Sequence, residues 1–469
     1  MTTEADAAWA LAPWDATETL ERIARKDISR LEMLTAAVRR AKDVSALNAI
    51  VTPTFERALA QSPVDGPLNG VPTFIKDLNQ VAGVRTRWGS LAMGDYVSRT
   101  SDPTVLQLEA TGLVSLGKSA APEFGLMPTT ESFATGPCHN PWDLSRTPGG
   151  SSGGAAALVS AGVVPLAHGS DGGGSIRIPA ACCGLVGLKP SAGRFNMPNT
   201  ALLPVQVAVE GVVTRSVRDT VLFWDALERR RKSPKLPPIG PVTPGSKRRL
   251  RIAISVDSPT GSKVDPEQIA AAERAATLCR ELGHEVQAVA CPFTVAQAND
   301  FMKLWAYLAF AQVKAAPLVT HRGFDPSKLE RWSQEIARDF SRDVLGALAG
   351  IRRLRRFAGQ YATVMESWDV LLTPTLAQPP PKLGHLSPDQ PFDELIAKMF
   401  AFTPFCALVN AAEAPALSLP LGRSATGLPI GVQFAAAKGQ ERTLLELGLA
   451  LEAAAPWPLL APRPPNAAA

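Results

Sequence analysis

The sequence predicts an α/β fold with a mixed β-sheet core that helices cover on both faces. Short apolar runs of strand length recur along the chain and are separated by stretches with helical spacing. No repeat of roughly 20 to 50 residues is visible, which argues against a solenoid. Of the 469 residues, 46% are hydrophobic, enough for a large core. We expect one large domain over residues 1–469.

The first predicted elements are helices. Residues 17–41 place apolar side chains three and four positions apart and are interrupted near Lys26, which predicts two amphipathic helices on one side of the core. A further helix is expected over 103–111. The apolar segment 155–168 is too short for a membrane span and is broken by Pro165, so it predicts a buried helix that leads into a strand.

Eight apolar runs are expected to form strands, because each has strand length and is flanked by turn residues. In chain order they are LNAIV, GVPTFIKD, LVSLGK, VVPLAH, LRIAISV, HEVQAV, DVLLTPT and ALSLPLG, which cover residues 47–51, 70–77, 113–118, 163–168, 250–256, 284–289, 369–375 and 416–422.

The charge balance argues against a strongly charged partner. The chain has 48 Lys and Arg against 43 Asp and Glu, a net charge of +5, which does not indicate nucleic-acid or membrane binding. A small-molecule substrate is the expected partner. The N-terminal segment has acidic residues where a signal peptide has a basic region. We therefore expect a cytoplasmic protein, either a monomer or a homodimer.

The cysteine pattern predicts reduced, mostly buried thiols and no metal site. No two cysteines form a CxxC pair, and no histidine stands at zinc-finger spacing. The six cysteines are Cys138, Cys182, Cys183, Cys279, Cys291 and Cys406.

Three polar segments are interpreted as surface structure. Residues 229–251 are rich in Lys, Arg and Pro and lack acidic and aromatic residues, which favours a solvated loop over a nucleic-acid-binding arm. The segment IRRLRRF at 351–357 is expected to form one basic helix face. Residues 462–469 are expected to be a frayed C-terminal tail.

Residues 112–119, GLVSLGKS, match the phosphate-binding pattern GxxxxGK[ST]. However, Leu113, Val114 and Leu116 look like a strand, so no Gly-rich interior is left to wrap around phosphates. We predict a strand here rather than a nucleotide site, with Lys118 at the surface or at a loop entry.

The segment TPGGSSGG at 147–154 places two serines between two pairs of glycines. It fits a flexible linker, and it also fits the GxSxG turn that carries the nucleophile of an α/β-hydrolase. An esterase of that kind would use Ser151 with a histidine base such as His385. It needs a strand that leads into Ser151, whereas the preceding NPWDLSRTP is turn-like.

A second glycine-rich turn, HGSDGGGSIRIPA at 168–180, is the stronger candidate for a nucleophile. Gly172, Gly173 and Gly174 lead into Ser175, and consecutive glycines let backbone N–H groups converge on one point, as an oxyanion hole requires. Ser175 is then the expected attacking residue. A serine needs a base, but none of the five histidines lies in a recognisable triad setting.

A lysine can replace the histidine when burial lowers its pKa. Lys76 ends the apolar run GVPTFIKD, where a strand would carry it into the core. The alternative is a lysine at the surface that forms a salt bridge with a neighbour such as Asp77.

Taken together, these segments resemble the amidase signature family over nearly the whole chain. The resemblance places a signature core at about 67–220 and a variable substrate-pocket region at about 290–405. The Gly/Ser-rich block is its most specific part. The matching segments are ISRLEMLTAAVRRA, PLNGVPTFIKD, LVSLGKSAAPEF, NPWDLSRTPGGSSGGAAA, AHGSDGGGSIRIPAACCGLVGLKPSAGR, WDVLLTPT, ALSLPLG and GLPIGVQF.

The resemblance implies a catalytic unit of two serines and a lysine. Ser175 would be the nucleophile, Ser151 the bridging serine and Lys76 the base. It also implies a cis peptide bond between Gly150 and Ser151. No metal or organic cofactor is implied.

Other residues are implied to support this unit. Backbone N–H groups of Gly172, Gly173, Gly174 and Ser175 would form the oxyanion hole. Ser152 is expected to add a hydrogen bond near Lys76, whereas Asp171 and Arg177 would brace the glycine turn.

The implied activity is cleavage of C–N bonds in small, hydrophobic amides through an acyl-enzyme on Ser175. PLAHGSDGGGSIRIPA and TPFCALVNAAEAPALSLPLG are similar to the branch with nylon-oligomer (aminohexanoate cyclic dimer), aryl-amide and carbamate hydrolases. Expected substrates are anilides, linear or cyclic oligoamides, and also carbamates (urethanes) and esters. The largely uncharged stretches 199–209, 301–317 and 399–405 either pack in the core or line the pocket.

Within the family the alternative is the glutamine-hydrolysing subunit of a tRNA-dependent amidotransferase, which needs charged groups for a free amino acid. The stretch around Thr403 has no acid. A non-enzymatic adaptor is a further alternative, in which the two serines and the lysine would have no purpose. The chain departs from the family pattern at Gly172, where a side chain is usual, at Ser170, where threonine is common, and at Pro128, where glycine is frequent.

Overall fold

The computed structural model describes residues 4–197, 203–245, 248–320 and 323–462. Its centre is a sheet of eight strands in the order β10-β9-β11-β13-β12-β7-β8-β6, with a smaller sheet in the order β1-β3-β2. The strands are β1 (Ile50–Pro53), β2 (Pro72–Lys76), β3 (Val114–Ser119), β4 (Glu131–Ser132), β5 (Gly136–Pro137), β6 (Leu166–Asp171), β7 (Val186–Lys189), β8 (Val209–Thr214), β9 (Arg251–Ile254), β10 (Glu285–Ala288), β11 (Val370–Pro374), β12 (Ala416–Arg423) and β13 (Pro429–Ala435).

The large sheet is mixed, as predicted. Strand β9 pairs in parallel with both β10 and β11, whereas every pair from β11 to β6 is antiparallel. The helices are α1 (Glu4–Ala10), α2 (Ala16–Ala24), α3 (Arg30–Asp43), α4 (Phe55–Ala60), α5 (Pro103–Glu109), α6 (Gly153–Ser160), α7 (Arg177–Cys183), α8 (Val217–Arg230), α9 (Pro266–Glu281), α10 (Val295–Thr320), α11 (Arg331–Arg342), α12 (Val344–Leu354), α13 (Phe357–Ser367), α14 (Phe392–Phe402), α15 (Ala407–Ala411) and α16 (Glu441–Ala454).

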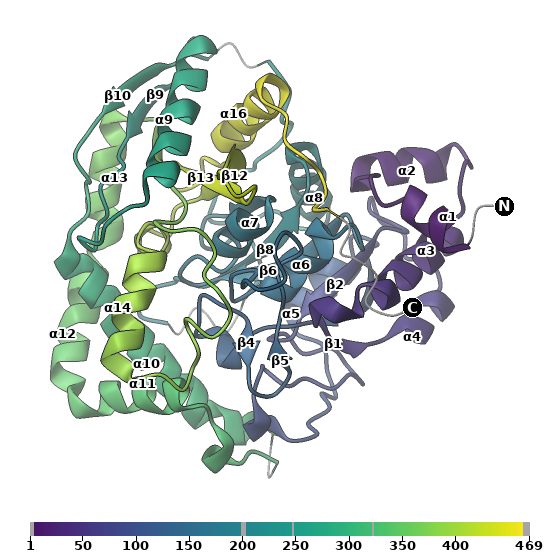
Figure 1. Cartoon of the computed structure of the whole chain (residues 1–469), viewed down its shortest axis with the longest axis horizontal. Coiled ribbons are helices and arrows are strands. Elements are labelled where there is room, and N and C mark those ends of the chain that lie inside the picture. The colour runs from purple at the N-terminus through teal and green to yellow at the C-terminus, as the bar shows by residue number, and fades with distance from the viewer. Residues whose placement is uncertain (1–3, 198–202, 246–247, 321–322, 463–469) are drawn as a thin grey trace.

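Helices cover the large sheet on both faces. In β13 the alternate residues Ile430 and Val432 belong to the same apolar cluster as Leu444 of α16, so this face of the strand packs toward α16. Gly431 faces the other way: a Cβ on it would lie 2.4 Å from the Cβ of Ala181 in α7. Successive strand residues point to opposite faces, so α7 and α16 lie on opposite sides of the sheet (Figure 1).

The small sheet brings β2 against β6 at the edge of the large sheet. Strand β2 runs parallel to β3, with Lys76 opposite Ser119. The Thr73 hydroxyl donates a hydrogen bond of 3.2 Å to the Leu166 carbonyl of β6. This contact places the C-terminal end of β2, and therefore Lys76, beside the end of β6.

The predicted elements are largely confirmed. Each of the eight apolar runs overlaps a strand, and 155–168 folds as part of α6 followed by the start of β6. The break between α2 and α3 occurs where Lys26 adopts φ 65°. Ser29 then caps the N-terminus of α3 in a capping box, in which the Ser29 and Glu32 side chains bind each other's backbone N–H groups. Strands β4, β5, β7, β8 and β13 were not predicted.

Two expectations about basic residues are wrong. Lys118 lies in a strand, as expected, but it is buried rather than at the surface, and its Nζ lies 2.9 Å from Asp77 Oδ1. An ammonium group survives burial when a carboxylate pairs with it, and Asp77, which directly follows the neighbouring strand β2, supplies that partner. The basic segment 351–357 is not one helix face, since α12 ends at Leu354 and α13 begins at Phe357.

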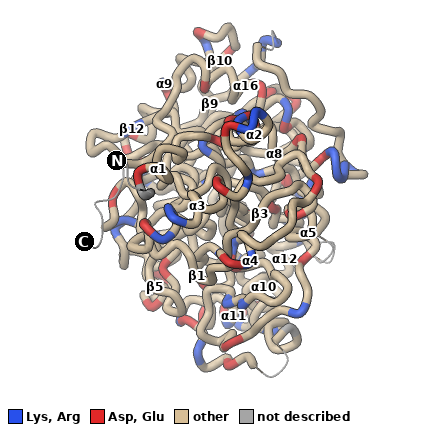
Figure 2. The backbone as a smooth tube through the Cα atoms, turned by 90° about the vertical axis from the view of Figure 1, so that its right-hand side faces the viewer, with Lys and Arg blue, Asp and Glu red and all other residues tan. Residues whose placement is uncertain are grey.

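The remaining surface and cysteine expectations agree with the described residues. Residues 231–245 and 248–250 form neither helix nor strand. Most of the cysteines are buried, and all six are free. On the side shown in Figure 2, basic and acidic residues are interspersed over α1–α5 and α8. Of the predicted tail, only residue 462 lies within the described part of the chain.

Candidate active site

A fully buried lysine stands at the end of β2. The Nζ atom of Lys76 donates hydrogen bonds to Ser151 Oγ at 2.7 Å and to Ser170 Oγ at 2.9 Å, and it lies 3.4 Å from the Ser170 carbonyl. Asp77 forms its salt bridge with Lys118. The alternative stated from the sequence, a salt bridge between Lys76 and Asp77, is therefore wrong.

The surroundings of Lys76 favour a neutral amine near neutral pH. Burial lowers the pKa of Lys76 to about 7, and the negative charges of Glu210 and Asp171 oppose this effect. Desolvation disfavours the ammonium form, whereas nearby carboxylates favour it. At pH 7 to 8 a large fraction of Lys76 can therefore accept a proton.

Ser151 and Ser152 lie in a turn that leads into α6. The peptide bond between Gly150 and Ser151 is cis. A Cβ on Gly150 would lie 2.5 Å from the Thr129 carbonyl oxygen, so only glycine fits there. Ser152 Oγ donates to the Ser170 carbonyl at 3.2 Å. It thus contacts a neighbour of Lys76 rather than Lys76 itself.

The glycine turn follows β6 and is organised by Asp171. Its carboxylate accepts the Gly174 N–H at 2.7 Å and the Ile176 N–H at 3.1 Å. The N–H of Gly174 therefore points to Asp171 and not to the pocket. Among the described residues, the N–H groups of Gly172, Gly173 and Ser175 have no hydrogen-bond acceptor.

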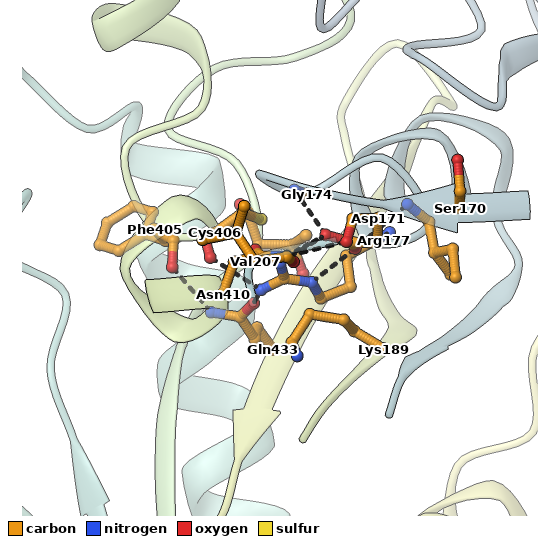
Figure 3. Close-up of polar contacts among 12 residues, drawn as sticks. Ser170, Asp171, Gly174, Arg177, Lys189, Val207, Phe405, Cys406, Asn410 and Gln433 are labelled. Carbon is orange, nitrogen blue, oxygen red and sulfur yellow. Dashed lines mark hydrogen bonds and ion pairs between the residues drawn. The ribbon is translucent and has the colours of Figure 1, made fainter. Parts of the chain in front are cut away.

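Arg177 fixes Asp171 from behind the turn. Its guanidinium binds both Asp171 oxygens at 3.0 Å and also reaches Asn410 Oδ1 and Gln433 Oε1 (Figure 3). Burial alone would raise the pKa of Asp171, but Arg177 holds it well below its usual range. Asn410 and Gln433 were not predicted, because they lie more than 230 positions after Arg177 in the chain.

A pocket opens in front of Ser175. Within the described part of the chain, no charged side chain lines it. Gly125 connects this pocket to Ser151, since a Cβ on Gly125 would lie 3.3 Å from Ser151 Oγ. The lining residues are Gly125, Leu126, Met127, Pro128, Gly173, Ser175, Ile178, Thr260, Ala298, Phe301, Met302, Trp305, Met399, Phe400, Thr403, Pro404, Ala407 and Leu408.

Aromatic rings from α10 cover the glycine turn. Phe301 and Trp305 are stacked, with ring centroids 5.7 Å apart. A Cβ on Gly172 would lie 3.2 Å from the Trp305 ring, and one on Gly173 would lie 3.3 Å from Phe301. The Trp305 ring therefore takes the space that a side chain at position 172 would need, which accounts for the glycine there.

The three uncharged stretches have different positions. Part of 301–317 and part of 399–405 line the pocket. Within 199–209, Val205 and Val207 belong to the apolar core, and residues 199–202 lie outside the described part of the chain. The alternative base His385 is exposed and lines a different surface depression, together with Arg146 and Lys382.

Comparison with known proteins agrees with this geometry. A buried lysine, two serines and a glycine turn lie beside an uncharged pocket, and the family and relatives described next are hydrolases that act on amide C–N bonds. The sequence model of the amidase family matches residues 32–445. The chain belongs to this family, and the resemblance stated from the motifs is confirmed.

Several relatives cover almost the whole chain. The Mycobacterium leprae protein named "Putative amidase AmiC" is 42% identical over 96% of each chain. The 6-aminohexanoate-cyclic-dimer hydrolase of a Pseudomonas species is 36% identical, over 94% of this chain and 95% of its own. The structure of a 6-aminohexanoate cyclic dimer hydrolase complexed with substrate superposes with a TM-score of 0.85 at 32% identity, over 95% and 97% of the chains.

A bacterial aryl acylamidase of the amidase signature enzymes also shares the fold, with a TM-score of 0.83 at 26% identity over 95% and 96% of the chains. The predicted fold class is thus confirmed. Within the described residues, no helix has both the length and the apolar composition needed to cross a membrane.

Proposed function

We propose that this amidase works through an acyl-enzyme on Ser175, with Lys76 as the base and Ser151 as the proton relay. The observation that carries the proposal is the buried contact of 2.7 Å between Lys76 Nζ and Ser151 Oγ. Neutral Lys76 takes a proton from Ser151, which takes one from Ser175 as its Oγ attacks the amide carbonyl. The relay then returns the proton to the leaving amine, and water hydrolyses the acyl-enzyme.

The negative charge that develops on the carbonyl oxygen needs fixed donors. The N–H groups of Gly172, Gly173 and Ser175 are available for this role, because they have no other acceptor among the described residues. Gly174 supports the turn through Asp171 instead. We therefore propose an oxyanion hole without Gly174, which differs from the set predicted from the sequence.

The catalytic assignment is tested with single substitutions assayed on an anilide. Ser175→Ala and Lys76→Ala are expected to lower kcat/KM by about a thousandfold or more, because they remove the nucleophile and the base. His385→Ala is the control, since its side chain is exposed and away from the pocket. Activity that survives Ser175→Ala but is lost in His385→Ala would identify the α/β-hydrolase alternative.

We propose small, hydrophobic amides as substrates, namely anilides and linear or cyclic oligoamides, with carbamates and esters as secondary substrates. The uncharged lining of the pocket supports this choice, as do the names of the cyclic-dimer hydrolase and aryl acylamidase relatives. Free glutamine would bury its charged groups against apolar side chains, which is costly. This disfavours the amidotransferase alternative.

The substrate class is tested through Trp305, whose ring covers Gly172. Trp305→Ala is expected to raise KM for an anilide more than tenfold, because it removes aromatic contact area of the kind that is worth about 1.5 kcal/mol or more when buried. The melting temperature serves as a control for folding. A wild type that prefers free glutamine to the anilide would contradict the proposed substrate class.

The cytoplasmic location and the monomeric or homodimeric state remain predictions.

A further inference from the structure

His168 and Ser170 approach Lys76 from the same face of β6. They are two positions apart in a strand, so their side chains point to the same side. The Nδ1 atom of His168 accepts the backbone N–H of Lys76 at 3.2 Å, and Ser170 Oγ accepts from Lys76 Nζ at 2.9 Å. Two side chains on one face of β6 therefore bind Lys76, one at its backbone N–H group and the other at its amine.

The hydrogen bonds of His168 define its tautomer. Because Nδ1 accepts a hydrogen bond, it carries no proton, and the proton of a neutral imidazole must be on Nε2. Nε2 lies 2.9 Å from Glu210 Oε2 and donates to it. Glu210 lies on β8, opposite Ser170 in the strand register. The buried chain of contacts thus runs from Lys76 through His168 to Glu210.

Glu210 lacks the Lys or Arg partner that two other carboxylates near Lys76 have among the described residues. Asp171 is paired with Arg177, and Asp77 is paired with Lys118. Among the described residues, the side chains that form hydrogen bonds with Glu210 are those of His168 and, at 3.3 Å, Asn79.

Asp102 is a further carboxylate nearby and accepts the Gln80 N–H at 2.7 Å. Within the described residues, no Lys or Arg forms a salt bridge with Glu210, so no bound cation neutralises its charge.

We propose that His168 and Glu210 are positioning residues of the lysine base. The imidazole fixes the end of β2 against β6, and the carboxylate stabilises the ammonium form of Lys76 that the reaction must hold between its two proton transfers. This inference rests on the proposed role of Lys76. Without such a carboxylate, burial would leave the lysine too weak a base to take the proton from Ser151.

The direct test is the pH dependence of kcat/KM for Glu210→Gln. Glutamine keeps an oxygen that can accept from His168 but carries no charge. Burial lowers the pKa of Lys76 and Glu210 opposes this, so the substitution is expected to lower that pKa further. Because only the neutral amine is a base, the acidic limb of the profile should move to lower pH, by about one unit.

A second readout separates the two proton transfers. A leaving amine must be protonated, whereas p-nitrophenolate leaves without a proton. Glu210→Gln makes Lys76 a weaker base but makes its ammonium form a stronger acid, so the variant should lose kcat for the p-nitrophenyl ester at least as much as for the anilide. Glu210→Asp, which keeps the charge, should leave the acidic limb near its wild-type position.

Glu452→Gln is the matched control. Glu452 of α16 is a largely buried carboxylate that accepts the Val217 N–H, and it does not act on Lys76, so its removal should not move the limb. His168→Leu is expected to lower kcat at least tenfold, and His168→Asn, which keeps an acceptor near the Nδ1 position, should restore part of it.

An acidic limb that stays in place in Glu210→Gln would overturn the inference. If Glu210→Gln does not fold, Glu210→Ser is used instead, because it removes the same charge. The same shift of the acidic limb is then expected. The proposed role of Lys76 as the base is tested by a different variant: it is wrong if Lys76→Ala keeps its activity.

Discussion

Among the described residues, the amine of Lys76 contacts only oxygens of Ser151 and Ser170, and no carboxylate binds it directly. Such an arrangement suits a base that must be neutral at the start of each cycle. It also reduces stability, because the unfolded chain can protonate this lysine freely whereas the folded chain cannot.

The stability cost can be measured with Lys76→Met. The pKa of Lys76 is about 7 in the folded protein, against 10.5 for a fully hydrated lysine. Between these values the unfolded state binds more protons, so the wild type gains stability as pH rises from 7 to 10. We expect the unfolding free energy of the wild type, relative to Lys76→Met, to increase by about 2 to 4 kcal/mol over this range. An identical difference at pH 7 and pH 10 in urea unfolding would show that Lys76 is not desolvated.

At the scale of elements, α6 determines where the two serines lie. Its first turn packs directly against the backbone of neighbouring segments. A Cβ on Gly154 would lie 2.4 Å from the Ala120 nitrogen and 2.8 Å from the Ala49 carbonyl oxygen. Glycine at 154 therefore allows the helix to approach closely enough to hold Ser151 beside Lys76.

This close approach predicts opposite effects for two glycine substitutions in helices. Gly154→Ala is expected to lower the unfolding free energy by about 2 kcal/mol or more, because backbone atoms cannot rotate out of the way. In α13, an added Cβ at Gly359 meets no atom within 4 Å, so Gly359→Ala should raise stability by about 0.5 to 1 kcal/mol. Thermal unfolding of both variants checks this. A Gly154→Ala protein as stable as the wild type would contradict the packing described.

At the scale of the whole molecule, Arg194 joins segments that are far apart in the chain. It follows β7 and forms buried ion pairs with Glu228 of α8 and Glu441 of α16, at 3.0 Å and 2.6 Å. Burial alone would raise the pKa of Glu441, but Arg194 holds it below its usual value. One guanidinium thus links the segment after β7 to both α8 and the C-terminal helix α16.

Removal of this guanidinium would leave two buried carboxylates without a cation. Arg194→Ala is therefore expected to lower the unfolding free energy by about 3 kcal/mol or more. Arg229→Ala removes a pair with Asp225 that is exposed on both sides, and it should change stability by less than about 1 kcal/mol. Equal losses in the two variants, measured by urea unfolding, would contradict the role of Arg194.

How much the sequence could predict follows from how far each contact reaches along the chain. Lys76, Ser151 and Ser175 lie in short segments whose glycine and strand patterns are visible locally. His168 and Glu210 are 42 positions apart, and their contact depends on the pairing of β6 with β8, a strand that was not predicted. Lys118 was misplaced because its partner Asp77 lies 41 positions earlier, directly after β2, and the contact depends on the pairing of β2 with β3.

The most direct test of the account is to trap the acyl-enzyme. Wild type and Ser175→Ala are mixed with a p-nitrophenyl ester, quenched with acid within one turnover and analysed by intact-protein and peptide mass spectrometry. The account predicts that the wild type gains the mass of the acyl group, on the peptide that contains Ser175, and that the variant gains none. An acyl group on Ser151, or one that persists in Ser175→Ala, would contradict it.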